Sequence, residues 1–325
     1  MLINNIKHQI KDSNSKPKII LVEGWNSIVQ KAAIFLKQEN IIEPILMLKN
    51  KEQLNKEIES LSKVIIDEID IQHYGSFLYE MRKSKGLSLE DANKFAMMPN
   101  YLSALMVKEG KYDGSVCGIE YATKDTLRPA LQIVKTSKNA SIVNTLMILE
   151  KGNDTLLFSD IGMIVDPNFE ELAYITENTI RFAVESLNMK NNRVAMLSFS
   201  SNGSGNGASV DKVRNAYELV KTRNIFPNEN IFGEMQLDAA FDENVRSKKI
   251  PSLNWNGKAN IYIFPNLDAG NISYKIMQRF AGYDVVGPIV IGLDKPINDL
   301  SRGANISEVI SLSYITALQF LENRN

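Results

Sequence analysis

Hydrophobic residues along the chain follow two alternating patterns. Short runs rich in isoleucine, leucine and valine, such as KIILV at 18–22, have the length and composition of buried strands. Longer stretches, such as 208–223, repeat their apolar positions every three or four residues, as helices with one buried face do. Because the two patterns alternate along the chain, they predict a layered α/β fold built from βαβ units.

The individual elements follow from these patterns and from the glycines and prolines between them. The expected strands are 18–22, 44–48, 63–66, 141–150, 155–158, 193–199, 231–234, 260–264 and 288–292. The expected helices are 27–37, 51–62, 88–109 with a break at Pro99, 126–134, 169–188, 208–223, 271–280 and 306–321. Pro99 suits the first turn of a helix, where its missing NH needs no partner.

The pattern changes near residue 140. Residues 141–150 and 155–158 flank the turn-forming segment KGND, which predicts a β-hairpin, and alternating helices and strands then resume. A length of 325 residues favours two domains. We therefore predict one domain from both chain ends, residues 1–140 and 288–325, and an inserted domain of residues 141–287.

Composition narrows the classes of function. Lys and Arg number 37 against 38 Asp and Glu, a net charge of -1, so no basic excess points to a nucleic-acid partner. The chain has no apolar run of about 18 residues, and its N-terminal segment is too polar for a signal peptide, so we expect a cytoplasmic protein with no membrane partner. Cys117 is the single cysteine, which fits a reducing compartment. With only His8 and His73, the chemistry must rely on carboxylates, hydroxyls and arginines.

Two loop segments are candidates for a site. SFSSNGSGNGAS at 198–209 joins a strand to a helix, and its glycines allow backbone NH groups to turn toward an anion. Its glycine spacing fits neither a dinucleotide fingerprint nor a P-loop, and a flexible connection explains it equally well. KPINDLSRG at 295–303 follows the last expected strand, where open α/β sheets place ligands. Its Asp299 and Ser301 are also suited to capping turns, a role that composition alone slightly favours.

A third segment, TKDTLRPALQ at 123–132, contains Arg128 just before a helix that we expect to begin near Pro129. Asp125 or Thr126 is the expected cap of that helix. A guanidinium at this place offers paired donors to a phosphate or a carboxylate. An ordinary surface ion pair is the commoner role of an arginine, so both interpretations stay open.

The remaining reactive residues give weaker signals. Arg82 lies in the cationic segment MRKSKG, which a solvated helix face also explains. Cys117 lies in an apolar stretch with no histidine nearby in sequence, so we expect it to be packed in the core and not to act as a nucleophile. No set of Asp and Glu residues has a known metal-ligand spacing, so no metal site is expected.

Several segments together resemble the phosphate acetyl/butyryltransferase family. They are MRKSKG at 81–86, YDGSVCG at 112–118, TKDTLRPALQIVKT at 123–136, LSFSS at 197–201, GEMQLDAA at 233–240, IFPNLDAGNISYK at 263–275 and GPIVIGLDKPINDLSRG at 287–303. The resemblance runs from about residue 75 to the C-terminus. It implies two three-layer α/β domains with an interdomain cleft, similar in fold to the isocitrate and isopropylmalate dehydrogenases, and a homodimer.

The resemblance also implies a reaction and the residues that perform it. The reaction is an acyl transfer of acetate metabolism, acetyl-CoA + phosphate ⇌ acetyl phosphate + CoA, by direct attack of the CoA thiolate in a ternary complex. CoA, acetyl phosphate and phosphate are substrates, and no cofactor is implied. The family's catalytic serine and arginine match Ser301 and Arg302, and two further active-site arginines match Arg82 and Arg128, so that the three arginines bind phosphate and CoA. The family's catalytic aspartate lies seven positions after the serine, where this chain has Glu308, with the same carboxylate on a longer arm.

Three alternatives differ in substrate or class. Within the family, the acyl group is butyryl or another acyl chain, because the sequence identifies no acyl-pocket residue. The shared architecture also fits a nucleotide-dependent decarboxylating dehydrogenase, although no metal-binding set of aspartates accompanies it. A protein that binds acyl-CoA or acyl phosphate without turnover is the third alternative, favoured only if Glu308 does not act as a base.

Overall fold

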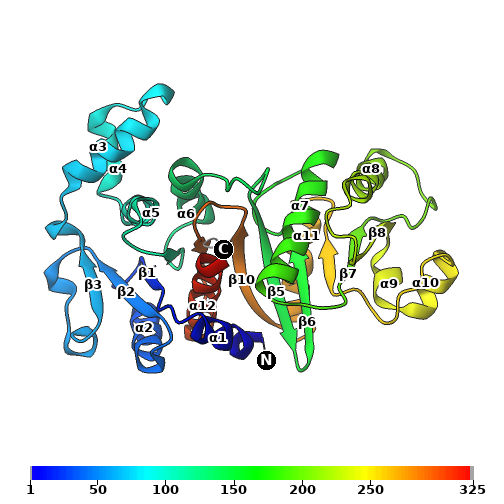
Figure 1. Ribbon diagram of the computed structural model, residues 1–325, viewed down its shortest axis with the longest axis horizontal. Coiled ribbons are helices and arrows are strands. Elements are labelled where there is room, and N and C mark those ends of the chain that lie inside the picture. The colour runs from blue at the N-terminus through cyan, green and yellow to red at the C-terminus, as the bar shows by residue number, and fades with distance from the viewer. Residues whose placement is uncertain (1, 323–325) are drawn as a thin grey trace. The chain divides into compact units, whose positions relative to one another are not determined.

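A computed structural model describes residues 2–322 of the chain (Figure 1). By their internal contacts the residues divide into two compact units. The terminal unit consists of Met1–Lys138 and Leu293–Asn325, and the inserted unit consists of Asn139–Gly292.

The terminal unit is built on a parallel sheet of five strands in the order β11-β4-β1-β2-β3. Its strands are β1 (Lys18–Leu21), β2 (Glu43–Leu48), β3 (Ser62–Ile65), β4 (Gly114–Cys117) and β11 (Ile297–Asp299). Its helices are α1 (Leu2–Asp12), α2 (Ser27–Glu39), α3 (Ile71–Arg82), α4 (Leu89–Ala96), α5 (Pro99–Glu109), α6 (Thr123–Pro129) and α12 (Ile306–Glu322). Consecutive residues of β4 and β11 are buried, as expected of parallel strands covered on both faces. Helices α5 and α12 pack against β4, and α2 packs against β2.

The inserted unit contains a mixed sheet of six strands in the order β10-β5-β6-β9-β7-β8. Its strands are β5 (Asn144–Lys151), β6 (Asp154–Ser159), β7 (Arg193–Leu197), β8 (Asn230–Met235), β9 (Ile261–Ile263) and β10 (Asp284–Ile291). Its helices are α7 (Phe169–Arg181), α8 (Ala208–Arg223), α9 (Leu237–Phe241), α10 (Glu243–Lys249) and α11 (Leu267–Arg279). The predicted β-hairpin is confirmed, because β5 and β6 pair antiparallel with Lys151 opposite Asp154. Figure 1 shows α7 and α11 on opposite sides of this sheet.

The predicted mixed α/β class is confirmed, but several elements differ from the sequence prediction. The helix expected at 51–62 is wrong: the segment forms two short 3₁₀ turns, Lys51–Gln53 and Lys56–Ile58. Between them the Asn55 side chain accepts hydrogen bonds from the NH groups of Glu57 and Ile58. These bonds cap the second turn and separate it from the first, so no continuous helix forms. Six helices and strands of the described residues were not expected at all, namely α1, α3, β4, α9, α10 and β11.

The helix around Arg128 also begins elsewhere than predicted. It starts at Thr123, so Pro129 lies inside it and neither Asp125 nor Thr126 is its cap. A proline in this position cannot donate to the carbonyl four residues earlier. The Asn100 side chain donates to that carbonyl, the one of Asp125, at 2.7 Å. The open carbonyl is thereby satisfied, and the helix passes through the proline into the π-helical turn Ala130–Val134.

Candidate functional site

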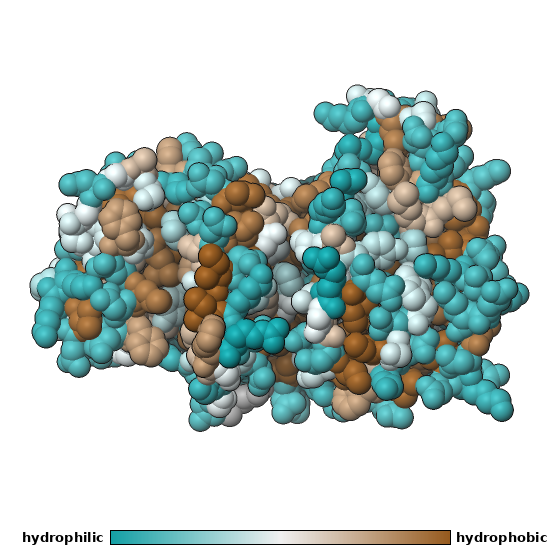
Figure 2. Space-filling view, turned by 180° about the vertical axis from the view of Figure 1, so that it is seen from behind, coloured by the Kyte–Doolittle hydropathy of each residue, from teal (hydrophilic) through white to brown (hydrophobic). Residues whose placement is uncertain are grey.

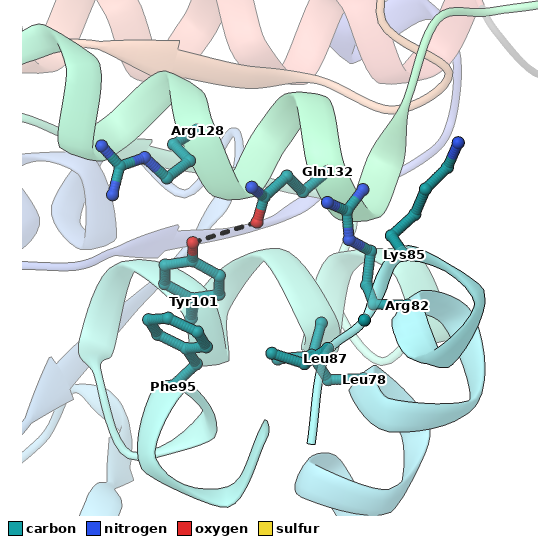
Figure 3. Close-up of a pocket in the computed structure, with 9 residues that line it drawn as sticks. Leu78, Arg82, Lys85, Leu87, Phe95, Tyr101, Arg128 and Gln132 are labelled. Carbon is teal, nitrogen blue, oxygen red and sulfur yellow. Dashed lines mark hydrogen bonds between the residues drawn. The ribbon is translucent and has the colours of Figure 1, made fainter. Parts of the chain in front are cut away.

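The terminal unit contains a pocket of about 320 Å³ formed by helices α3 to α6 and the turns that follow α3 and α6 (Figure 3). Its lining residues are Leu78, Arg82, Lys85, Gly86, Leu87, Phe95, Tyr101, Arg128 and Gln132. Cationic groups therefore share the pocket with apolar and aromatic side chains. Such a lining suits an anionic ligand that also carries an apolar or ring portion.

Arg82 and Arg128, predicted as site residues from separate motifs, both line this pocket. Arg82 is the last residue of α3, and the chain turns away at Gly86, whose φ of 83° favours glycine. Arg128 is exposed on α6. Within residues 2–322 neither guanidinium forms an ion pair with a carboxylate. Two unpaired guanidinium groups in one pocket make it a favourable place for a phosphate or a carboxylate.

An aromatic wall completes the pocket. Phe95 and Tyr101 are stacked, with ring centroids 4.8 Å apart. The Tyr101 hydroxyl donates to Oε1 of Gln132 at 3.1 Å, which leaves the Gln132 amide NH₂ free to donate elsewhere (Figure 3). Burial raises the pKa of Tyr101, and the positive charges of Arg128 and Arg82 oppose that rise. The hydroxyl is therefore a neutral donor at ordinary pH.

Sequence analysis missed these pocket residues although one signal was present. Gln132 lies four positions after Arg128 in the TLRPALQ motif, and residues at that spacing share a helix face. Phe95 and Tyr101 belong to α4 and α5, and nothing in their local sequence connects them to Arg128. Their place becomes visible only when the helices are packed.

Ser301 and Arg302 lie in another part of the terminal unit and do not line this pocket. Both are exposed in the loop that follows β11. The loop is fixed at its start, where the Leu300 NH donates to the Cys117 carbonyl at 2.6 Å. It turns back at Ser301, whose carbonyl accepts from the Ala304 NH at 2.9 Å. Arg302 and the Ser301 hydroxyl are thus accessible to a ligand.

Glu308 lies in the first turn of α12 and has a structural role there. The Asn305 side chain accepts from the Glu308 NH at 3.1 Å, and the Glu308 carboxylate accepts from the Asn305 NH at 3.3 Å. This reciprocal pair is a capping box, which satisfies NH groups left open at a helix N-terminus. The predicted base therefore also holds the start of a helix.

In the loop at 198–209, donor groups that could bind an external anion are hydrogen-bonded to a carboxylate of the protein itself. The buried Glu234 carboxylate accepts from the Gly203 NH at 2.9 Å and from the Ser200 hydroxyl at 2.8 Å. Arg214 pairs with the same carboxylate at 3.0 Å. An internal carboxylate thus takes the place of the external anion that we considered for this loop.

Cys117 is 1% exposed, and burial raises the pKa of its thiol. This agrees with the prediction that it is packed and not nucleophilic. Among residues 2–322, no three His, Cys, Asp or Glu side chains are grouped to bind a metal ion. Within the same residues, no helix has the length and apolar character needed to cross a membrane.

Comparison with known proteins identifies the family. The family model described as Phosphate acetyl/butaryl transferase matches residues 1–317. The chain belongs to this family. The phosphate acetyl/butaryl transferase assignment confirms the resemblance seen in the sequence motifs and extends it to the first 75 residues, where the motifs gave no match.

Relatives within the family cover the whole chain. The Phosphate acetyltransferase of Mycoplasma genitalium is 45% identical over 322 residues, which are 99% of each chain. The solved structure of a phosphotransacetylase from Streptococcus pyogenes has a TM-score of 0.90 at 36% identity, and the match covers 99% of this chain and 100% of that one. At 10% identity and a TM-score of 0.51, a Salmonella typhimurium structure described as a 4-hydroxythreonine-4-phosphate dehydrogenase shares the fold alone, over 94% of this chain and all of that one. The predicted likeness to dehydrogenases is thus one of fold.

Proposed function

We propose that the chain catalyses the reversible transfer of an acetyl group between CoA and inorganic phosphate. Relatives named phosphate acetyltransferase, matched over almost their full length, support this activity. The observation that carries the proposal to this chain is the pocket in which Arg82 and Arg128 lie without carboxylate partners among the described residues. Every substrate of the reaction carries phosphate, which unpaired guanidinium groups bind in forked geometry.

The chemistry needs few groups from the protein. Toward acetyl-CoA, a base removes the proton of the CoA thiol, and the thiolate attacks the carbonyl carbon of acetyl phosphate. The C–S bond forms, a tetrahedral oxyanion develops, and cleavage of the C–O bond releases phosphate with that bond's electron pair. The anhydride supplies the reactivity, so the proposal requires neither a metal nor a further cofactor, with CoA as a substrate.

We assign roles to the five predicted residues on this basis. Arg82 and Arg128 bind phosphate groups of CoA or acetyl phosphate, and Arg302 binds the phosphoryl group that leaves. The Ser301 hydroxyl donates to the developing oxyanion, a contribution worth about 10²- to 10³-fold in rate. Glu308 is the candidate base, because its carboxylate stands where the family has aspartate.

The test is an assay of thioester formation. The purified protein is mixed with acetyl phosphate and CoA in the presence of a chelator, and acetyl-CoA is measured by the ultraviolet absorbance of its thioester. We expect CoA-dependent formation of one acetyl-CoA per phosphate released. Binding of CoA without turnover would instead identify the protein as an acyl-CoA or acyl-phosphate binding protein.

We further propose that two copies associate through α11. Ile272, Ile276 and Phe280 are spaced at four-residue intervals and are 57%, 48% and 87% exposed. Side chains at this spacing share one helix face, and an exposed apolar stripe typically marks an interaction surface. Hydrophobic side chains also reach the surface in the view of Figure 2.

The association is tested by mass. Light scattering of the wild type should give twice 36.5 kDa, and Ile272→Lys with Ile276→Lys should give the single-chain mass. Leu54→Lys, at another exposed apolar position, is the matched control and should not change the mass. A wild type of single-chain mass would refute the homodimer.

The cytoplasmic location belongs to the same proposal. It is supported by the proposed substrates, which are intracellular metabolites, and by the presence of a single cysteine, Cys117, which cannot form a disulfide within the chain. Fractionation of cells that express the tagged protein tests it, with recovery from the membrane or the medium as the contrary result.

A further inference from the structure

Gln132 carries the one side-chain carbonyl among the described residues that line the pocket of the terminal unit. It lies in the π-helical turn Ala130–Val134, four positions after Arg128. In the view of Figure 3 its amide lies between the guanidinium groups of Arg128 and Arg82. None of these described lining residues has a carboxylate. The acceptors that their side chains offer are therefore the Gln132 amide oxygen and the Tyr101 hydroxyl.

Tyr101 takes up this amide oxygen. Its hydroxyl donates to Oε1 of Gln132 at 3.1 Å (Figure 3). The two branches of a primary amide point in different directions, and the NH₂ branch can only donate. With Oε1 turned to Tyr101, Nε2 is the branch that faces away from Tyr101. The hydrogen bond thus leaves the NH donors of Gln132 for an acceptor outside the protein.

The Tyr101 hydroxyl is held in place by its own surroundings. The residue is 4% exposed, and its ring stacks on Phe95 with the two planes 16° apart. Its NH donates to the side chain of Asn100 at 3.0 Å, and that side chain donates to the Asp125 carbonyl at 2.7 Å. Ordering a flexible glutamine side chain costs free energy when a ligand binds. A fixed hydroxyl that orders Gln132 before the ligand arrives removes part of that cost.

The donors around Gln132 define what the pocket accepts. Arg82 and Arg128 have no carboxylate partner among the described residues, and Lys85 adds a third cationic group. A phosphate group has several oxygens that accept hydrogen bonds, so two guanidinium groups leave acceptor sites for a neutral donor. A ligand group that itself donates, such as an ammonium, meets no open side-chain carbonyl here. The lining therefore selects a group made of acceptors.

We propose that Gln132 is a specificity-determining residue, whose amide NH₂ donates to a phosphate oxygen held by Arg82 and Arg128, and that Tyr101 is the positioning residue that orients this amide. The inference rests on the proposed function for the identity of that phosphate, which belongs to CoA or to acetyl phosphate. The hydrogen bond between Tyr101 and Gln132 carries it, because it uses the amide oxygen and leaves the NH₂ for the substrate.

A binding experiment tests the role of Gln132 without turnover. The purified protein is titrated in a calorimeter with CoA and, separately, with inorganic phosphate. Gln132→Met keeps the length of the side chain and removes its hydrogen bonds, so we expect about tenfold weaker binding of the ligand in the pocket. Gln132→Glu still accepts from Tyr101 but turns a negative acceptor to the phosphate, so it should weaken binding more than Gln132→Met. Gln72→Glu, which adds the same charge at an exposed position of α3, is the matched control and should bind as wild type does.

A double-mutant cycle tests the positioning role of Tyr101. Tyr101→Phe keeps the ring that stacks on Phe95 and removes the hydroxyl, so binding should weaken about two- to tenfold. In the Gln132→Met background the same change should have no effect, because no amide is left to orient. A purely structural role of the hydroxyl would give the same loss in both backgrounds. Tyr79→Phe removes a tyrosine hydroxyl of α3 outside the pocket lining and should bind as wild type does.

The outcomes separate this inference from the proposed function. Weaker binding of CoA by the Gln132 variants assigns the phosphate group to CoA, and weaker binding of inorganic phosphate assigns it to acetyl phosphate; either supports the inference. A wild type that binds these ligands but forms no acetyl-CoA contradicts the proposed function alone, and the variants still decide the role of Gln132. A wild type that binds neither ligand overturns both.

Two results would overturn the inference by itself. Binding retained or tightened in Gln132→Glu would show that the ligand meets an acceptor and not the NH₂. Because this variant keeps the hydrogen bond from Tyr101, it decides alone if Gln132→Met fails to fold. An equal loss from Tyr101→Phe in both backgrounds, or no loss in either, would overturn the positioning role of Tyr101.

Discussion

The double role of Glu308 gives a sharp prediction. Its carboxylate is the candidate base, and it also accepts from the Asn305 NH at 3.3 Å in the capping box of α12. Glutamine at this position of a capping box makes the same hydrogen bond as glutamate. Glu308→Gln therefore removes the basic carboxylate and keeps the cap, whereas Glu308→Ala removes both.

The two effects have different magnitudes and different measurements. Loss of a general base typically lowers the rate by about 10²- to 10⁴-fold. Loss of a capping interaction typically costs about 0.5–2 kcal/mol in the free energy of unfolding. We expect Glu308→Gln to lose at least about 100-fold in kcat with an unchanged urea midpoint. Glu308→Ala should show the same loss of kcat and a lower midpoint.

Steady-state kinetics with saturating CoA and urea unfolding followed by circular dichroism measure both effects on the same samples. Glu308→Asp tests the length of the arm, and the family pattern suggests that it retains activity. If Glu308→Gln has the kcat of wild type, Glu308 is a cap and not the base, and the thiol proton must go to another group.

Three further predictions concern the pocket, the sheet edge and the substrate. Arg82→Ala and Arg128→Ala should each lower kcat/KM by about 10- to 150-fold, the value of one charged hydrogen bond of about 1.5–3 kcal/mol, with unchanged thermal melting; unaltered kinetics in both would remove the pocket from the site. Gly118→Ala should destabilise the protein by about 1–3 kcal/mol or more, because its new β-carbon overlaps Asp299, and an unchanged urea midpoint would contradict this. In competition, acetyl phosphate should exceed butyryl phosphate in kcat/KM, since each methylene changes discrimination by about 1–3 kcal/mol; the reverse order would identify a butyryltransferase.

The sequence predicts the elements whose signals are local. Buried strands such as β1 and β2 are continuous apolar runs, and the hairpin of β5 and β6 has its turn residues between two such runs. Strand β11 was missed because it has three residues, two of them polar, and it is buried only because β4, α6 and α12 lie against it. Tertiary packing overrides local propensity there.

The site is also predictable only in part, because local motifs reveal single residues and tertiary packing decides which of them meet. Arg82 and Arg128 were found through separate motifs, and the pocket that unites them comes from the packing of four helices. The buried Glu23 gave no signal in the sequence, because the Gly118 NH that donates to its carboxylate lies 95 residues further along the chain.

The proline of the TLRPALQ motif explains how the pocket keeps its width. Pro129 leaves the Asp125 carbonyl without its helical donor, and the side chain of Asn100 supplies one at 2.7 Å. Asn100 precedes Tyr101 on α5, so this hydrogen bond joins the helix that carries Arg128 to the helix that carries the aromatic wall. The hydrogen bond from Tyr101 to Gln132 joins the same two segments about two helical turns further on. A local defect in one helix is thus compensated by a contact between helices, and that contact joins the helix that carries Arg128 to the helix that carries Tyr101.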